Sequence, residues 1–134
     1  DRLRVITAEA RSYLGVTSIG HRRYDVVVSD CFGGAEPVRE LATVESLRLV
    51  RGSLNPGGIY VANIVSANDR SDVSFLRDCA ATALEVFDHA WVIPCGDTEF
   101  GGEENYLLVA SDGDYAFADA VPFDADFLGT ALYD

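Results

Sequence analysis

The 134-residue sequence contains no lysine and no methionine, and it has only two histidines and one tryptophan. No apolar run approaches the roughly 18 residues that a membrane-spanning helix needs, and no signal-peptide pattern opens the chain. All ten basic residues are arginines, and they never gather into the cluster typical of DNA-binding proteins. The sequence therefore predicts neither a membrane partner nor a nucleic-acid partner. Since methionine is missing even at position 1, it also predicts a fragment or a processed chain.

Metal-ligating side chains are scarce as well. Cys31, Cys79 and Cys95 are too far apart for a zinc knuckle, and His21 and His89 lack the spacing of a ligand pair. An odd number of thiols suits a reducing cytoplasm better than a disulfide scaffold. The sequence therefore predicts a cytoplasmic protein without a metal site.

Acidic residues, in contrast, are abundant. The chain has 22 of them, a net charge of −12 and 49% hydrophobic residues, which is enough for one globular domain. Residues 1–77 carry all ten arginines and nine acids, whereas residues 78–134 carry thirteen acids and neither lysine nor arginine. Such a field attracts cationic small molecules and repels nucleic-acid phosphates. The alternative is that the acidity serves only solubility.

Strand-like and helix-like segments alternate along the chain. The expected strands are residues 3–7, 24–29, 59–65, 90–94 and 106–110. The expected helices are residues 8–14, residues 44–54 with Thr43 as N-cap, and a long helix opened by Ser71 or Asp72 with apolar positions recurring up to Phe87. A closing helix within residues 113–134 is expected to pack Phe117, Phe123, Phe127 and Leu132.

This alternation predicts an α/β fold with a mostly parallel sheet. The adjacent valines of residues 24–29 indicate a strand that is buried on both faces. The last two strands have no helix between them, so an antiparallel hairpin is expected there. In sheets of this kind, ligands bind beyond the carboxyl ends of the strands.

Three polar side chains lie at the expected carboxyl ends. Glu9 follows the first strand, Asp30 follows the second, and Asn63 lies near the end of the third. Together they suit a cationic or polyhydroxyl ligand, and a carboxylate there can act as a general base. Each also has a structural interpretation. Glu9 can stabilise a helix start, Asp30 can form an Asx-turn, and Asn63 can satisfy local backbone groups.

Familiar nucleotide-binding and nucleophile motifs are absent. The sequence has no Gly-x-Gly-x-x-Gly, no Walker loop and no Gly-x-Ser-x-Gly. Gly33-Gly34 is interpreted as a plain turn or as a ligand cradle, and the pair alone does not decide between them. Any glycine loop for a nucleotide is therefore expected outside these residues.

The order of these segments resembles known proteins. Val5–Ala10, Tyr24–Asp30, Pro37–Glu45 and Leu54–Gly58 have the layout of the class I, Rossmann-like S-adenosylmethionine-dependent methyltransferase fold. More narrowly, Asp30-Cys31-Phe32-Gly33-Gly34, followed by Pro37, Leu41, Thr43 and Glu45, resembles the spermidine synthase (polyamine aminopropyltransferase) family, especially its divergent bacterial relatives. The resemblance covers about residues 3–112.

The resemblance implies an activity and a set of site residues. The family transfers an aminopropyl group from decarboxylated S-adenosylmethionine to a polyamine such as putrescine. Asp30 matches its general base, which deprotonates the attacking amine. Glu9-Ala10 matches the Asp-Gly pair that reads the adenine, and Cys31 and Pro37 match the loop that lines the nucleoside.

The amine pocket differs from the family pattern. Asn63 stands where the family has a glutamine, Gly33 replaces a second aspartate, and Phe100 stands in place of a tyrosine. These differences weaken the case for putrescine itself and leave open another amine acceptor or a loss of activity.

Two strands with the glycine-rich cofactor loop precede these segments in the family. Residues 1–134 are therefore expected to be the C-terminal portion of a spermidine synthase-like catalytic domain that lacks the first strands. We expect this portion to bind the nucleoside poorly by itself. Its exposed strand edges invite pairing with another chain, so a homo-oligomer, a dimer, is expected.

Two other functions share much of the pattern. One is a small-molecule methyltransferase that uses ordinary S-adenosylmethionine, because fold alone does not fix function. The other is a non-catalytic homologue that binds a polyamine or a partner, which Gly33 and Phe100 favour.

Overall fold

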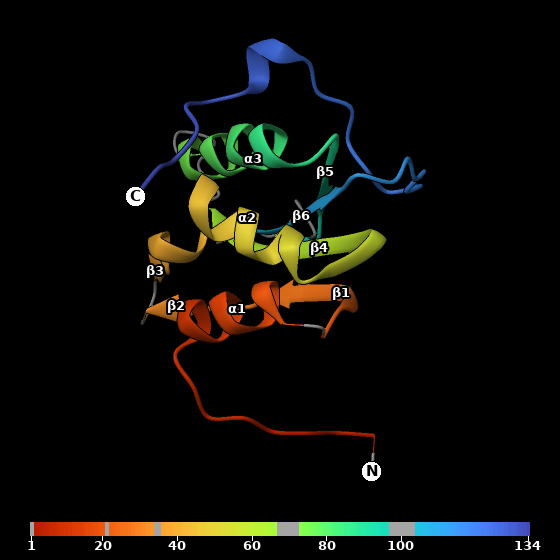
Figure 1. Cartoon of the computed structure of the whole chain (residues 1–134). Helices are drawn as coiled ribbons and strands as arrows, with labels where there is room; N and C mark the ends of the chain where they lie inside the picture. Colours follow the sequence, from red (N-terminus) through yellow and green to blue (C-terminus); the bar gives the residue numbers. More distant parts are fainter. Residues whose placement is uncertain (1, 21, 34–35, 67–72, 97–103) are drawn as a thin grey trace.

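The computed structural model describes residues 2–20, 22–33, 36–66, 73–96 and 104–134. Its elements, in chain order, are α1 (Ala10–Ile19), β1 (Tyr24–Ser29), β2 (Phe32–Gly33), β3 (Glu36–Pro37), the 3-10 turn η1 (Arg39–Leu41), α2 (Val44–Gly52), β4 (Leu54–Ser66), α3 (Ser74–Val86), β5 (His89–Pro94), β6 (Glu104–Ser111) and the 3-10 turn η2 (Ala125–Phe127). Helices and strands share one body (Figure 1), so the predicted α/β class is confirmed.

The main sheet has the order β1-β4-β6-β5 among the described strands. β1 pairs in parallel with β4, and α2 makes the crossover between them. β6 lies between β4 and β5 and is antiparallel to both, which confirms the predicted hairpin of the last two strands. The sheet is therefore mixed: within the described strands, parallel pairing is confined to β1 and β4.

The helices α1, α2 and α3 cover one face of this sheet (Figure 1). Leu47 from α2 and Leu76 from α3 are buried against Tyr60, Ala62 and Ile64 of β4. These three β4 residues alternate along the strand, as expected when one face is covered. The hydrophobic core therefore lies between the helices and this face.

The prediction that β1 is buried on both faces is wrong. Val27 packs against the core, but the side chains of Val26 and Val28 are 50% and 66% exposed. They point to the face opposite the helices, where no described element covers β1. Adjacent valines indicate full burial only where both faces of a strand are covered, and β1 is an edge strand with one covered face.

The expected strand at residues 3–7 is also wrong. This segment is not part of a sheet, and the side chains of Leu3 and Val5 are 83% and 84% exposed. A strand is stable only when its backbone groups pair with a neighbour, and none of the described strands lies beside this segment. The expected pairing of such an edge with another chain stays a prediction.

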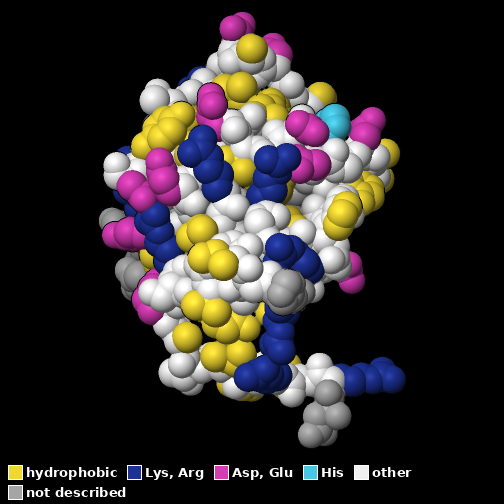
Figure 2. Space-filling model, viewed as in Figure 1, with side chains coloured by type: hydrophobic (Ala, Val, Ile, Leu, Met, Phe, Trp, Pro, Cys, Tyr) yellow, Lys and Arg dark blue, Asp and Glu magenta, His cyan; other side chains and the backbone are white. Residues whose placement is uncertain are grey.

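Helix α1 runs five residues beyond the predicted end at Leu14 and passes through Gly15. Leu14 packs against the core and Thr17 is buried, and this packing offsets the roughly 1 kcal/mol that glycine costs in a helix relative to alanine. The outer side of α1 exposes Val16 and Ile19. Figure 2 shows hydrophobic side chains at the surface in this lower part of the molecule.

Helix α2 begins as predicted. The Thr43 hydroxyl caps it by accepting a hydrogen bond from the Ser46 backbone N–H at 3.3 Å. Helix α3 buries Leu76, Ala80 and Ala83 of the predicted apolar positions, whereas Leu84 is only half-buried. The predicted first residues of that helix, Ser71 and Asp72, lie outside the described residues. No helix in the described part of the chain is long and apolar enough to cross a membrane.

The predicted closing helix is wrong, because residues 113–134 form an irregular strap with only the short turn η2. Phe123, Phe127 and Leu132 pack against the core as predicted, whereas Phe117 packs on Trp91 instead. Backbone groups of the strap bond to other elements: the Leu132 N–H donates to the Thr82 hydroxyl at 2.9 Å, and its carbonyl accepts from Val44 at 2.8 Å. These tertiary hydrogen bonds replace the internal bonds of a helix.

Candidate active site at the carboxyl end of β1

The carboxyl end of the parallel β1–β4 ladder brings two predicted site residues into contact. Ser29 is paired with Ala62 at the end of the parallel ladder, so the next residues, Asp30 and Asn63, lie side by side. The Asn63 Nδ2 donates a hydrogen bond to Asp30 Oδ1 at 3.0 Å, and Asp30 is exposed. One carboxylate oxygen of Asp30 is therefore oriented by the amide, and the other has no hydrogen-bond donor among the described residues.

Glu9 is the N-cap of α1. Its Oε1 accepts from the Arg11 backbone N–H at 2.9 Å and its Oε2 accepts from the Ser12 backbone N–H at 2.7 Å. Hydrogen bonds from the Ser12 side chain and then from these backbone groups lower the pKa of Glu9 below its usual value. The structural interpretation of Glu9 therefore holds, while a contact with adenine stays a prediction.

The start of α1 is also held by a charged contact. The Arg11 guanidinium pairs with the carboxylate of Asp134, and the same carboxylate accepts a hydrogen bond from the Thr43 hydroxyl at 2.8 Å. The hydrogen bond from Arg11 lowers the pKa of Asp134. Since Thr43 caps α2, this contact fixes the first turns of α1 and α2 relative to each other.

A cavity of about 310 Å³ lies between α1 and β1. Two predicted site residues, Ala10 and Cys31, line it. The other lining residues are Tyr13, Leu14, Thr17, Tyr24, Val26, Val27, Val28, Ser29, Leu41, Val50 and Tyr60. The lining is mainly apolar, and the carboxylates of Glu9 and Asp30 belong to the neighbours of Ala10 and Cys31 in the chain. The expected acidic crevice is therefore an apolar hollow with acids next to its lining residues.

A smaller hollow of about 30 Å³ continues toward Asn63 and shares Ser29, Cys31 and Tyr60 with the first. The phenol of Tyr60 is buried and in hydrogen-bonding contact with the Ser29 side chain, and burial raises its pKa above the usual range. The phenol of Tyr60 therefore stays neutral where Tyr60 and Ser29 line both hollows.

Known proteins resemble this chain in sequence and in fold. No protein-family model matches the chain. A curated polyamine aminopropyltransferase from Aeropyrum pernix is 29% identical over 115 residues, which cover 83% of this chain and 34% of that protein. The crystal structure of a probable spermidine synthase from Corynebacterium glutamicum is 29% identical, with a TM-score of 0.62, covering 77% of this chain and 37% of the other. The chain is spermidine synthase-like.

A second solved structure extends the likeness in fold. A spermidine synthase in complex with the transition-state analogue AdoDATO superposes with a TM-score of 0.67 at 19% identity, covering 89% of this chain and 39% of the other. The expected Rossmann-like, methyltransferase-type fold is thereby confirmed. The spermidine synthase-like chain spans little more than a third of the length of these proteins.

The remaining predicted site residues are only partly placed. Pro37 and Gly33 lie in the short antiparallel pair β2–β3, where Phe32 faces Pro37 and Gly33 faces Glu36 in the backbone register. The region predicted as a loop therefore contains this small ladder. Phe100 lies outside the described residues. The roles assigned to Pro37, Gly33 and Phe100 stay predictions.

The sequence interpretation of this site missed two tyrosines. The hydroxyls of Tyr13 and Tyr24 lie 3.1 Å apart on the wall of the 310 Å³ cavity. A signal was present: Ala10, Tyr13, Leu14 and Thr17 have the spacing of one helix face. Because the predicted helix ended at Leu14, that face was not followed to Thr17. In the described part of the chain, no group of three or more potential metal ligands occurs.

Proposed function

We propose that this spermidine synthase-like chain carries the catalytic part of a polyamine aminopropyltransferase, with Asp30 as the general base. The observation that supports this most directly is the contact between Asn63 and Asp30 at 3.0 Å. It holds a carboxylate at the carboxyl end of a parallel strand, which is where ligands bind in α/β sheets. The other carboxylate oxygen is available to accept a proton.

The proposed reaction is a displacement at carbon. The lone pair of the acceptor amine attacks the aminopropyl methylene next to the sulfonium of decarboxylated S-adenosylmethionine. The carbon–sulfur bond breaks and its electron pair stays on sulfur, which becomes a neutral thioether. Asp30 takes the proton that the amine nitrogen loses. Positioning and deprotonation are therefore the contributions required of the protein.

The nucleoside of the donor is proposed to enter the cavity between α1 and β1. Ala10 and Cys31 line this cavity, whose volume of about 310 Å³ lies in the usual range for small-molecule sites. Its apolar lining suits an adenine ring. Pro37 and Glu9 are proposed as further contacts to the nucleoside, and Asn63, Gly33 and Phe100 as contacts to the amine acceptor.

Charge also supports this choice of substrates. Decarboxylated S-adenosylmethionine and polyamines are cations, and the chain has a net charge of −12. A negative field raises the local concentration of cationic substrates. A methyltransferase of similar fold uses a donor that carries an additional carboxylate, which Asp30 would repel. The proposed location is the cytoplasm, as the odd number of thiols predicts.

The experiment that tests the proposal compares two donors. The protein at its natural length is titrated calorimetrically with decarboxylated and with ordinary S-adenosylmethionine. We expect tighter binding of the decarboxylated donor, and transfer to putrescine or a related amine detected by mass spectrometry. A clear preference for the carboxylated donor, with methyl transfer, would replace the proposal by the methyltransferase alternative.

A further inference from the structure

A second cavity, of about 410 Å³, lies at the opposite end of the sheet from Asp30. Its lining residues come from the end of α3, from β5 and from the strap: Leu84, Asp88, His89, Ala90, Trp91, Asp114, Ala120, Val121, Pro122 and Phe123. The register fixes its place, because His89 pairs with Ser111 and Ser111 with Ile59, near the beginning of the β1–β4 ladder. The cavity is therefore separate from the proposed active site.

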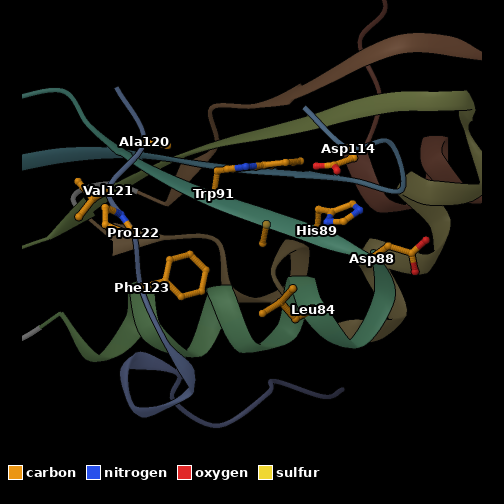
Figure 3. Close-up of a pocket in the computed structure, with 10 residues that line it drawn as sticks. Leu84, Asp88, His89, Trp91, Asp114, Ala120, Val121, Pro122 and Phe123 are labelled. Atoms are coloured by element: carbon orange, nitrogen blue, oxygen red, sulfur yellow. The ribbon is translucent and has the colours of Figure 1, made fainter. Parts of the chain in front are cut away.

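Three aromatic residues, His89, Trp91 and Phe123, belong to its lining. The imidazole of His89 stacks on the indole of Trp91, with 5.8 Å between ring centroids and 30° between planes. Trp91 also packs edge-on against the ring of Phe117, with 5.0 Å between ring centroids, and against the ring of Tyr115, with 6.4 Å between centroids. In Figure 3, the side chains of Trp91 and His89 lie on one side of β5, and those of Phe123 and Leu84 lie on the other side, at the edge of the same pocket. The indole is half-buried, so it is held in place and still reachable.

Two carboxylates lie at one end of this pocket. In Figure 3, Asp88 and Asp114 are at the end next to His89, away from Val121 and Pro122. Within the described residues, neither carboxylate has a hydrogen bond or an ion pair. The neighbouring Asp112 differs, since its carboxylate pairs with the Arg51 guanidinium at 2.8 Å and accepts from the Asp88 backbone N–H at 3.1 Å.

The cation next to these acids, the guanidinium of Arg51, is paired with Asp112 and forms no ion pair with Asp88 or Asp114 within the described residues. From residue 78 to residue 134 the chain has thirteen acidic residues and neither lysine nor arginine. Anions are therefore repelled from the pocket. An indole face attracts a cation, and this attraction adds to that of the carboxylates. A metal ion would contact the carboxylates and make no use of the aromatic rings, whereas an organic cation contacts both.

From this combination we propose that the cavity binds an organic cation, namely a primary ammonium or guanidinium group carried on an apolar body. The charged group lies between Asp88 and Asp114, and the apolar body lies against Trp91. This site is distinct from the one at Asp30, and the inference does not depend on the transferase assignment.

The sequence supplies a local reporter for the test, because Trp91 is the only tryptophan in the chain. Phenethylamine, a primary amine on an aromatic body, is titrated into the 134-residue chain while Trp91 fluorescence is recorded, and calorimetry gives the dissociation constant independently. The control ligand is 2-phenylethanol, which has the same body without the charge. We expect a saturable fluorescence change with phenethylamine and binding of the alcohol weaker by about tenfold, the effect of two exposed carboxylates.

Single substitutions test whether the two carboxylates of the pocket bind the amine. Asp114→Asn and Asp88→Asn are each expected to weaken phenethylamine binding about two- to fivefold, as removal of one exposed charge contact does. Asp126→Asn is the matched control, because Asp126 is exposed, lies outside the pocket and carries the same charge change. Circular dichroism checks that all variants stay folded. The proposal is overturned if binding is not saturable, if the alcohol binds as well as the amine, or if Asp126→Asn weakens binding as much as Asp114→Asn.

Discussion

The two ends of the β1–β4 pair carry the same kind of contact in different surroundings. At the amino end, Asn55 Nδ2 donates to Asp25 Oδ1 at 2.8 Å, and at the carboxyl end Asn63 Nδ2 donates to Asp30 Oδ1 at 3.0 Å. All four residues belong to or adjoin the same two strands. The hydrogen bond alone therefore does not distinguish a catalytic carboxylate from a structural one.

What lies next to each pair differs. Beside the amino end, the hydroxyls of Thr17 and Ser53 are buried and bond to each other at 2.8 Å, and the Ser53 carbonyl accepts from Tyr24 at 2.9 Å. The chain neighbours of both aspartates line the 310 Å³ cavity, but only those of Asp30 also line the smaller hollow, which Asn63 shares. We call the amino end, with its buried hydroxyl pair, the closed end, and the carboxyl end, where the second hollow reaches Asn63, the open end. We expect the closed end to contribute more to stability and the open end to hold the reacting carboxylate.

The largest expected effect comes from changing each aspartate in turn. Asp30→Asn removes the proposed base and is expected to lower the rate of aminopropyl transfer about 10²- to 10⁴-fold. Asp25→Asn is the matched control, with the same charge change and the same kind of partner, and is expected to change the rate by less than about twofold, as for a surface substitution. Steady-state assays of the protein at its natural length measure both rates.

This pair of variants also separates the proposal from the non-catalytic alternative. If Asp30→Asn and Asp25→Asn behave alike, the two ends are equivalent and Asp30 is not a base. Denaturant unfolding of both variants serves as the control, because a rate loss caused by unfolding would appear there as well.

The second prediction uses the three cysteines, which differ in burial. Burial raises the pKa of the Cys79 thiol to about 12, whereas Cys31 and Cys95 are exposed. The thiolate fraction of Cys79 is thus about a thousandfold below that of an unperturbed thiol. Iodoacetamide followed by peptide mass spectrometry is expected to label Cys31 and Cys95 in the folded chain, and Cys79 only in denaturant.

Labelling of Cys31 tests the open end directly, because Cys31 lines the 310 Å³ cavity there. We expect its alkylation to block nucleoside binding, and Cys31→Ser to prevent this inhibition. Alkylation of Cys95 in the same Cys31→Ser variant is the control and should leave binding intact. Inhibition that persists in Cys31→Ser would show that the cavity beside Cys31 is not the nucleoside site.

A smaller effect is expected at the closed end. Ser53→Ala removes the buried hydrogen bond to Thr17 and another to the Leu49 carbonyl at 3.0 Å, and should lower the free energy of unfolding by about 1 kcal/mol. Ser18→Ala, on the partly exposed side of α1, should change it by less than about 0.5 kcal/mol. Urea unfolding measures both, and equal losses would contradict the idea that the closed end is the more stabilising region.

The smallest effect concerns the pH dependence of the α1 cap. The folded pKa of Glu9 lies below its unfolded value because Ser12 and Arg11 donate hydrogen bonds to the carboxylate. Its stabilisation is therefore complete above the unfolded pKa and is lost as the pH falls through the folded pKa. The difference in unfolding midpoint between the native chain and Glu9→Gln should be present at pH 7 and small at pH 3. A difference that grows toward acid would show that the sign is wrong.

Much of the local structure was predictable because it depends on neighbouring residues. The valines of β1, the Thr43 cap of α2 and the apolar spacing of α3 each predicted an element that the structure contains. Of the three polar residues expected at one edge, Asp30 and Asn63 are in contact, as the rule that parallel strands end at one edge predicts. Glu9 follows a segment that forms no strand, and it caps α1 instead. The other inferences hold because hydrophobic periodicity, helix capping and strand direction depend on short stretches of the sequence.

The wrong predictions concern contacts that no short stretch specifies. Leu3 and Val5 have a strand-like pattern but no described strand beside them, and Val28 has a core-like pattern on an uncovered face. The strap follows the sides of α2 and α3 because their backbone and hydroxyl groups offer it hydrogen bonds. In each case the burial and the backbone pairing of the segment depend on which elements pack next to it.

The sequence by itself determined the alternation of helices and strands from β1 to β6, the carboxylate that follows β1, and the strongly acidic charge of the second half. Tertiary structure alone decided which sheet face is covered, that a hollow opens beside Cys31, and that Asp114 lies near Trp91 at a second cavity. The physical reason is that periodicity and capping act over a few residues. Burial and cavities, in contrast, arise only where segments far apart in the chain pack together.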